Sequence, residues 1–341
     1  MSMTPTNPAL AATDVGFAPR RGWRRGVFPA IVLLVLVLPP LLLSDFRLTQ
    51  FTTVAVYGLA LLGLILLTGF GGQVSLGHGA IFAVGAYTTA IVMNSFGVSY
   101  WMAPLLGAAS CFVLGYLFGL PALKLPGHHL ALATFGLAVA VPQLLRFKGF
   151  DPWTGGFQGL TLVRPDPPFG LSLSGDQWMY LLAVLTLAAV YWIASNLLDS
   201  RMGRAIVAVR DHPIAATAMG IDTGSVKTMT FAISSLFTGL AGGLSAVSVL
   251  YVSADSFGAM LSITFLVGAV IGGLNSLPGA VFGALIVQFL PLLTERASQS
   301  ASTAIYGVCV ILAMYLMPTG IAGSLRSWVR RTERRARGQA R

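Results

Sequence analysis

Apolar runs that approach the length needed to cross a lipid bilayer recur along almost the whole chain, and none of them contains a charged residue. A membrane-spanning helix needs about 20 predominantly apolar residues. The runs lie at 28–43, 53–68, 79–96, 101–120, 128–145, 178–198, 228–252, 259–274, 279–294 and 303–318. Charged residues make up only 9% of the chain, compared with about 25% in soluble proteins. The sequence therefore predicts an all-α, polytopic membrane protein with about ten transmembrane helices.

The basic residues indicate how this protein is oriented. If the ten spans alternate in direction, sixteen of the 21 Lys and Arg residues fall on the same side as the N-terminus. Because Lys and Arg concentrate in cytoplasmic loops, we expect both termini in the cytoplasm. Eight spans with two re-entrant segments would keep the same orientation. The first run also resembles a signal peptide, but no small-residue cleavage site follows it, so we interpret it as a retained span.

This topology divides the chain into three parts. Residues 1–27 form a cytoplasmic N-terminal tail, residues 28–322 a transmembrane domain, and residues 323–341 a basic cytoplasmic tail suited to anionic lipid headgroups. Two loops stand out by their length. The loop 199–227 lies inside, and the extracytoplasmic loop 146–177 is polar enough to meet a binding protein but too short to be a domain.

The composition of the spans and the missing motifs exclude several classes of protein. A charge in the middle of a bilayer costs at least about 2.5–3.5 kcal/mol, and ion-coupled transporters accept that cost because coupling needs the charge. The absence of such residues argues against a proton-coupled transporter. The chain also lacks the G-x-x-x-x-G-K-[ST] motif, so we expect no ATPase or other enzyme activity. Cys111 and Cys309 lie in apolar runs and indicate neither a disulfide nor a metal site; no cofactor is predicted.

A stretch rich in glycine and polar residues, "LLTGFGGQVSLGHGA", interrupts the apolar pattern between the second and third runs. Irregular backbone at membrane depth persists only where protein buries it or water reaches it, and broken helices in transporters lie beside the substrate path. The stretch is therefore a candidate for the translocation path or its gate, or else a structural elbow held by its side chains. The candidate residues are Gly69, Gly71, Gly72, Gln73, Ser75, Gly77 and His78.

The inside loop 199–227 contains signals for a short helix. Asp211 or His212 can cap it, Pro213 suits its first turn, and Gly220 can end it in a left-handed conformation. A simple re-entry turn would need only a few residues, so a helix that docks on a cytoplasmic partner explains the length of the loop better. The candidate coupling residues are Arg204, Arg210, Asp211, Pro213, Ala215, Ala216, Ala218 and Gly220. The alanines would allow close approach of the partner.

Several motifs resemble a known family. The stretches "GFGGQVSLGHGAIFAVGAY" and "GRAIVAVRDHPIAATAMGIDTGSVKTMTFAISSLFTGLAGGL" are similar to the LivM and LivH permeases of branched-chain amino acid ABC importers. "GLPALKLPGHHLALATFG", "TGGFQGLTLV", "SITFLVGAVIGGLNSLPGAVFGALIV" and "YGVCVILAMYLMPTGIAG" fit the LivM-type member in order. The resemblance covers roughly residues 50–325. One departure is Asn275, where the family usually has glycine.

The resemblance implies a permease subunit of an ATP-driven importer in the bacterial inner membrane. It also implies a second LivH-like permease, two ABC ATPase subunits and a periplasmic or lipoprotein substrate-binding protein as partners; nothing indicates nucleic acid. Branched-chain amino acids are the first expectation for the solute, and urea, short amides and aromatic acids remain open. The alternative of another class is a self-sufficient channel or facilitator, which would have no use for the helix-bearing inside loop.

Overall fold

The computed structural model describes residues 34–36, 38–40, 42–122, 127–163, 174–297, 302–316 and 319–325, and they are mainly helical. The long helices are α3 (Asp45–Leu64), α4 (His78–Phe96), α5 (Ala103–Ala122), α6 (Gly127–Leu145), α8 (Gly175–Asp199), α11 (Thr223–Val249), α12 (Ala259–Gly272), α13 (Pro278–Ala297) and α14 (Ser302–Leu316). The predicted all-α class is confirmed. Half of the predicted first span, all of the predicted N-terminal tail and most of the predicted C-terminal tail lie outside the described residues.

Six helices in the described part of the chain are long and apolar enough to cross a membrane. They are α3 with the π-helical segment η2 (Ile65–Phe70) that continues it, α4, α5, α8, α11 and α13. A seventh span results if α6 is joined to η3 (Lys148–Phe150) and α7 (Asp151–Thr154), which follow at an angle of 59°. α12 has 14 residues and α14 has 15. The chain is thus polytopic, while ten spans and the orientation of the termini stay predictions.

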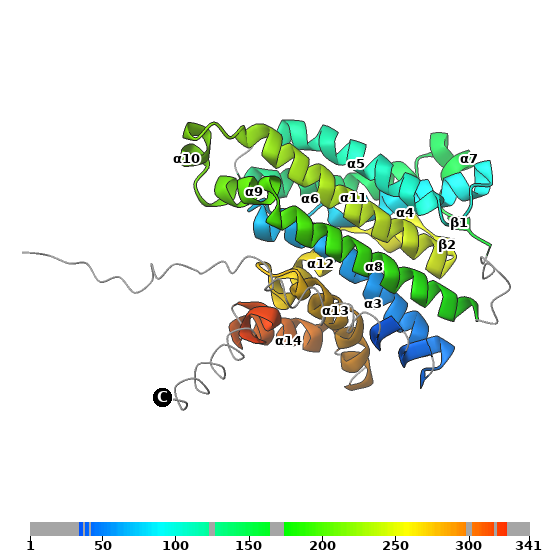
Figure 1. The fold of residues 1–341 in the computed structure, drawn as a ribbon. Helices are drawn as coiled ribbons and strands as arrows, with labels where there is room; N and C mark the ends of the chain where they lie inside the picture. Colours follow the sequence, from blue (N-terminus) through cyan, green and yellow to red (C-terminus); the bar gives the residue numbers. More distant parts are fainter. Residues whose placement is uncertain are drawn as a thin grey trace, which may run out of the picture.

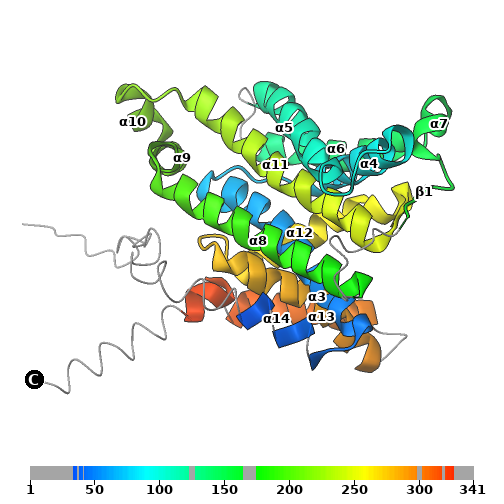
Figure 2. The ribbon, with the colours of Figure 1, turned by 45° about the vertical axis from the view of Figure 1, so that its right-hand side comes forward.

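Helices α3 and α11 form the centre of the bundle. α11 packs against α3, α4 and α5, and α3 also packs against α8 and α13. In α3 and η2, 89% of the apolar stretch is buried, compared with 39% in α8 and 33% in α13. Figures 1 and 2 show α5 and α6 on one flank of this centre and α13 and α14 on the other.

Glycines let the central helices approach one another closely. A Cβ atom added at Gly85 of α4 would fall on the backbone of Gly239 in α11, and one at Gly107 of α5 would lie 2.7 Å from the carbonyl oxygen of Gly85. On the other flank, a Cβ at Gly283 of α13 would fall on the carbonyl of Gly268 in α12. Membrane helices associate through such small residues because they gain little from apolar contact alone.

Both ends of the bundle carry folded segments (Figures 1 and 2). One end carries α9 (Arg201–Asp211) and α10 (Pro213–Ala218). The opposite end carries α7, the strands β1 (Leu160–Thr161) and β2 (Tyr251–Val252), and the 3-10 helix η5 (Ala254–Phe257). The strands are antiparallel, with Leu160 opposite Val252 and Thr161 opposite Tyr251. Both loops that stood out in the sequence therefore contain regular structure.

Candidate functional site

The chain leaves regular α-helix before it turns between α3 and α4. Ile65–Phe70 form a π-helix, and the Gly71 amide bonds to the carbonyl of Leu66, five residues earlier. Gly72 then has a φ of +67°, a left-handed conformation that glycine adopts without steric cost. We call residues 69–79 the glycine break. π-helical turns are rare in proteins, and those that do occur are often found at functional sites. This geometry therefore keeps the glycine break as a candidate site.

All three polar side chains that marked the glycine break are buried. Gln73 is 7% exposed, and Ser75 and His78 are 1% exposed. Gln73 Nε2 donates to the carbonyl oxygen of Lys227 at 3.3 Å. His78 Nδ1 lies 3.0 Å from Ser75 Oγ, and His78 Nε2 lies 2.7 Å from Ser234 Oγ in α11. In this conformation the three side chains face protein rather than an open path.

The hydrogen-bond network assigns the proton on His78. Ser234 Oγ donates to the carbonyl oxygen of Gly63 at 2.7 Å, since a carbonyl can only accept. Ser234 Oγ therefore accepts from His78 Nε2–H, and in a neutral ring His78 Nδ1 then accepts from the hydroxyl of Ser75. The ring has a partner at each nitrogen, as buried polar groups generally do. The resulting chain of bonds joins the glycine break to α4, α11 and α3.

Two backbone amides attach the glycine break to further helices. The Leu76 amide donates to Thr134 Oγ1 of α6 at 3.0 Å, and the Gly79 amide donates to Ser262 Oγ of α12 at 2.9 Å. These bonds satisfy backbone donors that no helix pairs at this turn. The glycine break is thereby bonded to three helices besides α3 and α4, namely α6, α11 and α12. Its own side chains make only some of these bonds, and hydroxyls from other parts of the chain make the rest.

The glycines at this turn are sites of close approach. A Cβ added at Gly69 would fall on the backbone carbonyl of Leu274, in the turn between α12 and α13. One at Gly77 would lie 2.9 Å from the carbonyl oxygen of Thr134, and one at Gly71 would lie 2.6 Å from the carbonyl oxygen of Leu67. Backbone atoms cannot move aside as a flexible side chain can, so a larger residue would displace the glycine break.

The predicted short helix of the inside loop is present. α10 begins at Pro213, and Gly220 follows it with a φ of +81°, the left-handed conformation expected from the sequence. Of the two predicted capping residues, His212 occupies the cap position, but its side chain makes no capping hydrogen bond. The Asp211 carboxylate instead accepts from Arg210 Nε at 2.8 Å.

The alanines of α10 do not share one face. Ala216 is 4% exposed and packs in the main hydrophobic core, whereas Ala215 and Ala218 are exposed. The expectation that all three offer close approach to a partner is wrong for Ala216, because that side of α10 lies against the chain itself. The outer face presents Ile214 and Met219, which are 87% and 82% exposed.

Helix α9, which precedes α10 in the same loop, was not among the elements expected from the sequence. Its side chains Ile206, Val207 and Val209 are buried, while Arg204 is exposed and donates to the carbonyl oxygen of Asp199 at 3.1 Å. Apolar residues grouped between charged ones at helical spacing are the signal that would have predicted this amphipathic helix.

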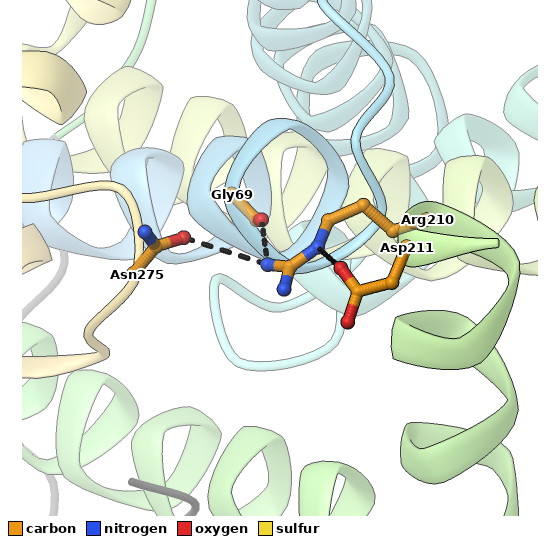
Figure 3. A network of polar contacts seen from close by, with 4 residues as sticks. All are labelled: Gly69, Arg210, Asp211 and Asn275. Carbon is orange, nitrogen blue, oxygen red and sulfur yellow. Dashed lines mark hydrogen bonds and ion pairs between the residues drawn. The ribbon is translucent and has the colours of Figure 1, made fainter. Parts of the chain in front are cut away.

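Arg210, at the end of α9, points toward the glycine break (Figure 3). Its side chain is 18% exposed. Arg210 Nη1 donates to the carbonyl oxygen of Gly69 at 2.9 Å and lies 3.5 Å from Asn275 Oδ1 in the turn between α12 and α13. The structure therefore brings together two candidate sites that are far apart in the sequence, and it adds Asn275, Ser234, Thr134 and Ser262 to them.

The predicted extracytoplasmic loop is folded in its described part. Arg146 forms an ion pair with Asp255 of η5, and its guanidinium lies 5.6 Å from the centre of the Phe157 ring. Tyr251 of β2 donates to the carbonyl oxygen of Gln158 at 3.0 Å. These contacts hold the loop to the segment between α11 and α12; its residues 164–173 lie outside the described residues.

The chain is similar to known transport proteins over most of its length. A family model described as "Branched-chain amino acid transport system / permease component" matches residues 47–317. The chain is 28% identical over 340 residues to the high-affinity branched-chain amino acid transport system permease protein LivM of Salmonella typhimurium, covering 93% of this chain and 79% of that protein.

Similarity extends to two further permeases. The chain is 25% identical over 285 residues to the permease protein LivH of the high-affinity branched-chain amino acid transport system of Salmonella typhimurium, covering 78% of this chain and 91% of that protein. It is 25% identical over 276 residues to the probable branched-chain amino acid transport permease protein LivM of Methanocaldococcus jannaschii, covering 76% of this chain and 78% of that protein. No solved structure matches the chain.

Proposed function

Because the chain belongs to the family of branched-chain amino acid transport permease components, we propose that it is the membrane subunit of an ATP-driven importer. The family match over residues 47–317 carries this proposal. It agrees with the six or seven apolar helices of spanning length. Members of the family are permease subunits rather than enzymes, and ATP hydrolysis belongs to separate subunits of the importer.

The two ends of the bundle suit different partners. On the cytoplasmic side, α10 presents Ile214 and Met219 to the exterior. Exposed apolar side chains on a helix that projects from the bundle support docking in a cleft of an ATPase subunit. The folded segment around α7 and η5 at the opposite end supports contact with a substrate-binding protein. Similarity to both LivM and LivH supports pairing with a second, related permease.

Branched-chain amino acids are the solute that the relatives' names favour. The apolar runs contain no charged residue, so the spans offer no fixed charge to neutralise an ionic solute. A small solute without net charge fits this property. Urea and short amides share it, whereas an anionic aromatic acid would cross without a basic partner.

The glycine break serves, in this proposal, as a structural elbow that shapes the translocation path. The burial of Gln73, Ser75 and His78 supports an elbow over a lining role. The close approach of Gly69 to Leu274 supports the same interpretation, because an elbow must fit tightly against its neighbours. A change in the position of the glycine break would also shift α3, α4 and the turn between α12 and α13.

Reconstitution in liposomes tests the proposed function. We expect ATP-dependent uptake of leucine, isoleucine or valine when the chain is combined with the second permease, the ATPase pair and the loaded binding protein, and none with the chain alone. Uptake by the chain alone without ATP would refute the importer and favour a channel. The solute is tested separately on the substrate-binding protein that supports uptake in this assay. We measure which compound raises its melting temperature: a branched-chain amino acid, urea, a short amide or an aromatic acid.

A further inference from the structure

Arg210 occupies the junction of three segments that are distant in sequence. Its backbone belongs to the last turn of α9, three residues before Pro213 begins α10. Its guanidinium reaches the carbonyl of Gly69 at 2.9 Å and lies 3.5 Å from Asn275 Oδ1. Its aliphatic stem lies against Gly72, where an added Cβ would be 2.6 Å from Arg210 Cγ. Figure 3 shows the side chain extended toward Gly69 and Asn275.

The carbonyl that Arg210 binds lies at the end of a helix. Gly69 is the last but one residue of η2, and the last carbonyls of a helix have no partner within it. A cation at this end is favoured by the helix dipole. η2 has no basic residue in its own last turn, so the cation comes from α9, 141 residues away in sequence.

This bond makes a short mechanical path from α10 to the glycine break. α10 follows α9 after one intervening residue, His212, and α9 packs on η2 and α11. A displacement of α10 therefore acts on Arg210 directly. The π-helical turn that receives it is a local departure from α-helix of a kind that occurs frequently at functional sites.

We propose that Arg210 is a positioning residue that transmits movement of α9 and α10 to the glycine break and to the turn between α12 and α13. The proposal rests on the proposed function, because the movement is the one an ATPase would impose on α10. In it, the guanidinium holds Gly69 and Asn275 in one arrangement, and Asp211 orients the guanidinium through the bond to Nε. Loss of the guanidinium uncouples ATP hydrolysis from solute movement.

Arg210→Met tests this in the complete importer, since methionine keeps an aliphatic stem against Gly72 but has no donor for Gly69. The matched control is Arg201→Met, because Arg201 is an exposed arginine of the same helix and is not among the candidate coupling residues. We expect Arg210→Met to assemble and hydrolyse ATP within about twofold of the unaltered importer but to move at least tenfold less leucine per ATP hydrolysed. Arg201→Met should stay within twofold on all measures. Arg210→Lys, which keeps one cationic donor, should be intermediate.

Labelling of the glycine break gives a second, direct measurement. Val74 is 40% exposed, so Val74→Cys can be labelled with a maleimide once Cys111 and Cys309 are replaced by alanine. We expect its labelling rate to differ at least threefold between the nucleotide-free importer and the importer trapped with ATP and vanadate. In Arg210→Met that difference should disappear, whereas in Arg201→Met it should remain.

Several outcomes decide the proposal. Unchanged leucine transport per ATP in Arg210→Met would overturn it, as would persistence of the nucleotide-dependent labelling of Val74→Cys. Equal loss of assembly, ATP hydrolysis and transport in Arg210→Met would also overturn it, because that pattern marks a purely structural residue. Failure of the proposed function is distinct: the unaltered complex would then show no ATP-dependent uptake of any solute.

Discussion

The glycine break and helix α10 arrange their polar and apolar groups in opposite ways. In the glycine break, Gln73, Ser75 and His78 are buried and bonded within the chain. On α10 and at the residue that caps its end, the large apolar side chains Ile214 and Met219 are exposed instead of packed in the chain. A satisfied buried network fixes one geometry, whereas exposed apolar side chains are available to another molecule. We therefore expect the glycine break to act within the subunit and α10 to act between subunits.

The largest effect is expected from filling the glycine break. Gly69→Ala places a Cβ on the backbone of Leu274, and overpacking costs about 1–3 kcal/mol or more where backbone must move. We expect initial uptake, corrected for membrane level, to fall at least tenfold. The control is Gly136→Ala in α6, where an added Cβ meets nothing within 4 Å. Equal uptake by the two variants would show that the tight fit of the glycine break is dispensable.

The two faces of α10 should respond differently to one substitution. Ala218→Arg changes the exposed face, so we expect normal thermal stability but at least tenfold weaker stimulation of the ATPase by the loaded binding protein. Ala216→Arg forces a charge into the core, because Ala216 is 4% exposed, and an unpaired buried charge is strongly destabilising. We expect a lower melting temperature for Ala216→Arg. Normal ATPase stimulation in Ala218→Arg would remove α10 from the docking surface.

Breaking the buried hydrogen-bond network around His78 should mainly lower the free energy of unfolding, with less effect on docking. His78→Leu leaves Ser75 without its ring partner and Ser234 without its donor, and an unsatisfied buried polar group costs about 1–3 kcal/mol. We expect a loss of that size in the free energy of unfolding, measured in detergent. His212→Leu, at an exposed position of the inside loop, is the control. Combined with Ser234→Ala, the effect of His78→Leu should be less than additive; additivity would show that the two groups are not coupled.

The smallest effect is expected at the cap that ends the inside loop. Asp222 accepts from the hydroxyl and amide of Ser225 and from the amide of Gly224. These bonds, the hydroxyl of Ser225 first, lower the pKa of Asp222 below its ordinary value of 3.8. A lowered pKa contributes stability that is present above pH 3.8 and is lost as the pH falls through the folded-state value.

Asp222→Asn should therefore lower the melting temperature slightly at neutral pH. The difference from the unaltered chain should shrink as the pH is lowered below about 4. Melting curves recorded across this range in detergent give the comparison. A difference that grows in acid would mean that the cap does not act through the ionised carboxylate.

Local signals in the sequence predicted the parts of the structure that depend on local chemistry. Apolar runs without charge predicted the spanning helices, and Pro213 with Gly220 predicted α10, because a helix start and a left-handed stop are set by one or two residues. The number of spans was harder to predict from the sequence, because α12 is as apolar as its neighbours but has only 14 residues. Apolarity alone does not show where a helix ends.

The partners of the glycine break were not predictable from the sequence. His78 bonds to Ser234, 156 residues away, and Leu76 bonds to Thr134, 58 residues away. A serine or threonine in an apolar helix gives no sign of which backbone or ring it will meet, since that depends on how helices pack. Arg210 was expected to be a coupling residue of the inside loop, and only the packing of α9 reveals that its side chain points toward the glycine break.

The burial of α3 has a consequence for how the protein is made. Roughly 150 residues separate the end of η2 from the start of α11, so at about 5–20 residues per second α3 waits on the order of ten seconds for its main partner. Its residues 54–64 are uncharged and mainly apolar, which suits them to lipid during that time. α11 carries the hydroxyls of Ser234 and Thr238, and by the time it enters the membrane Gly63 and His78 are already there to receive Ser234. The order of synthesis thus places α3, which lipid accepts, before α11, which needs partners for its hydroxyls.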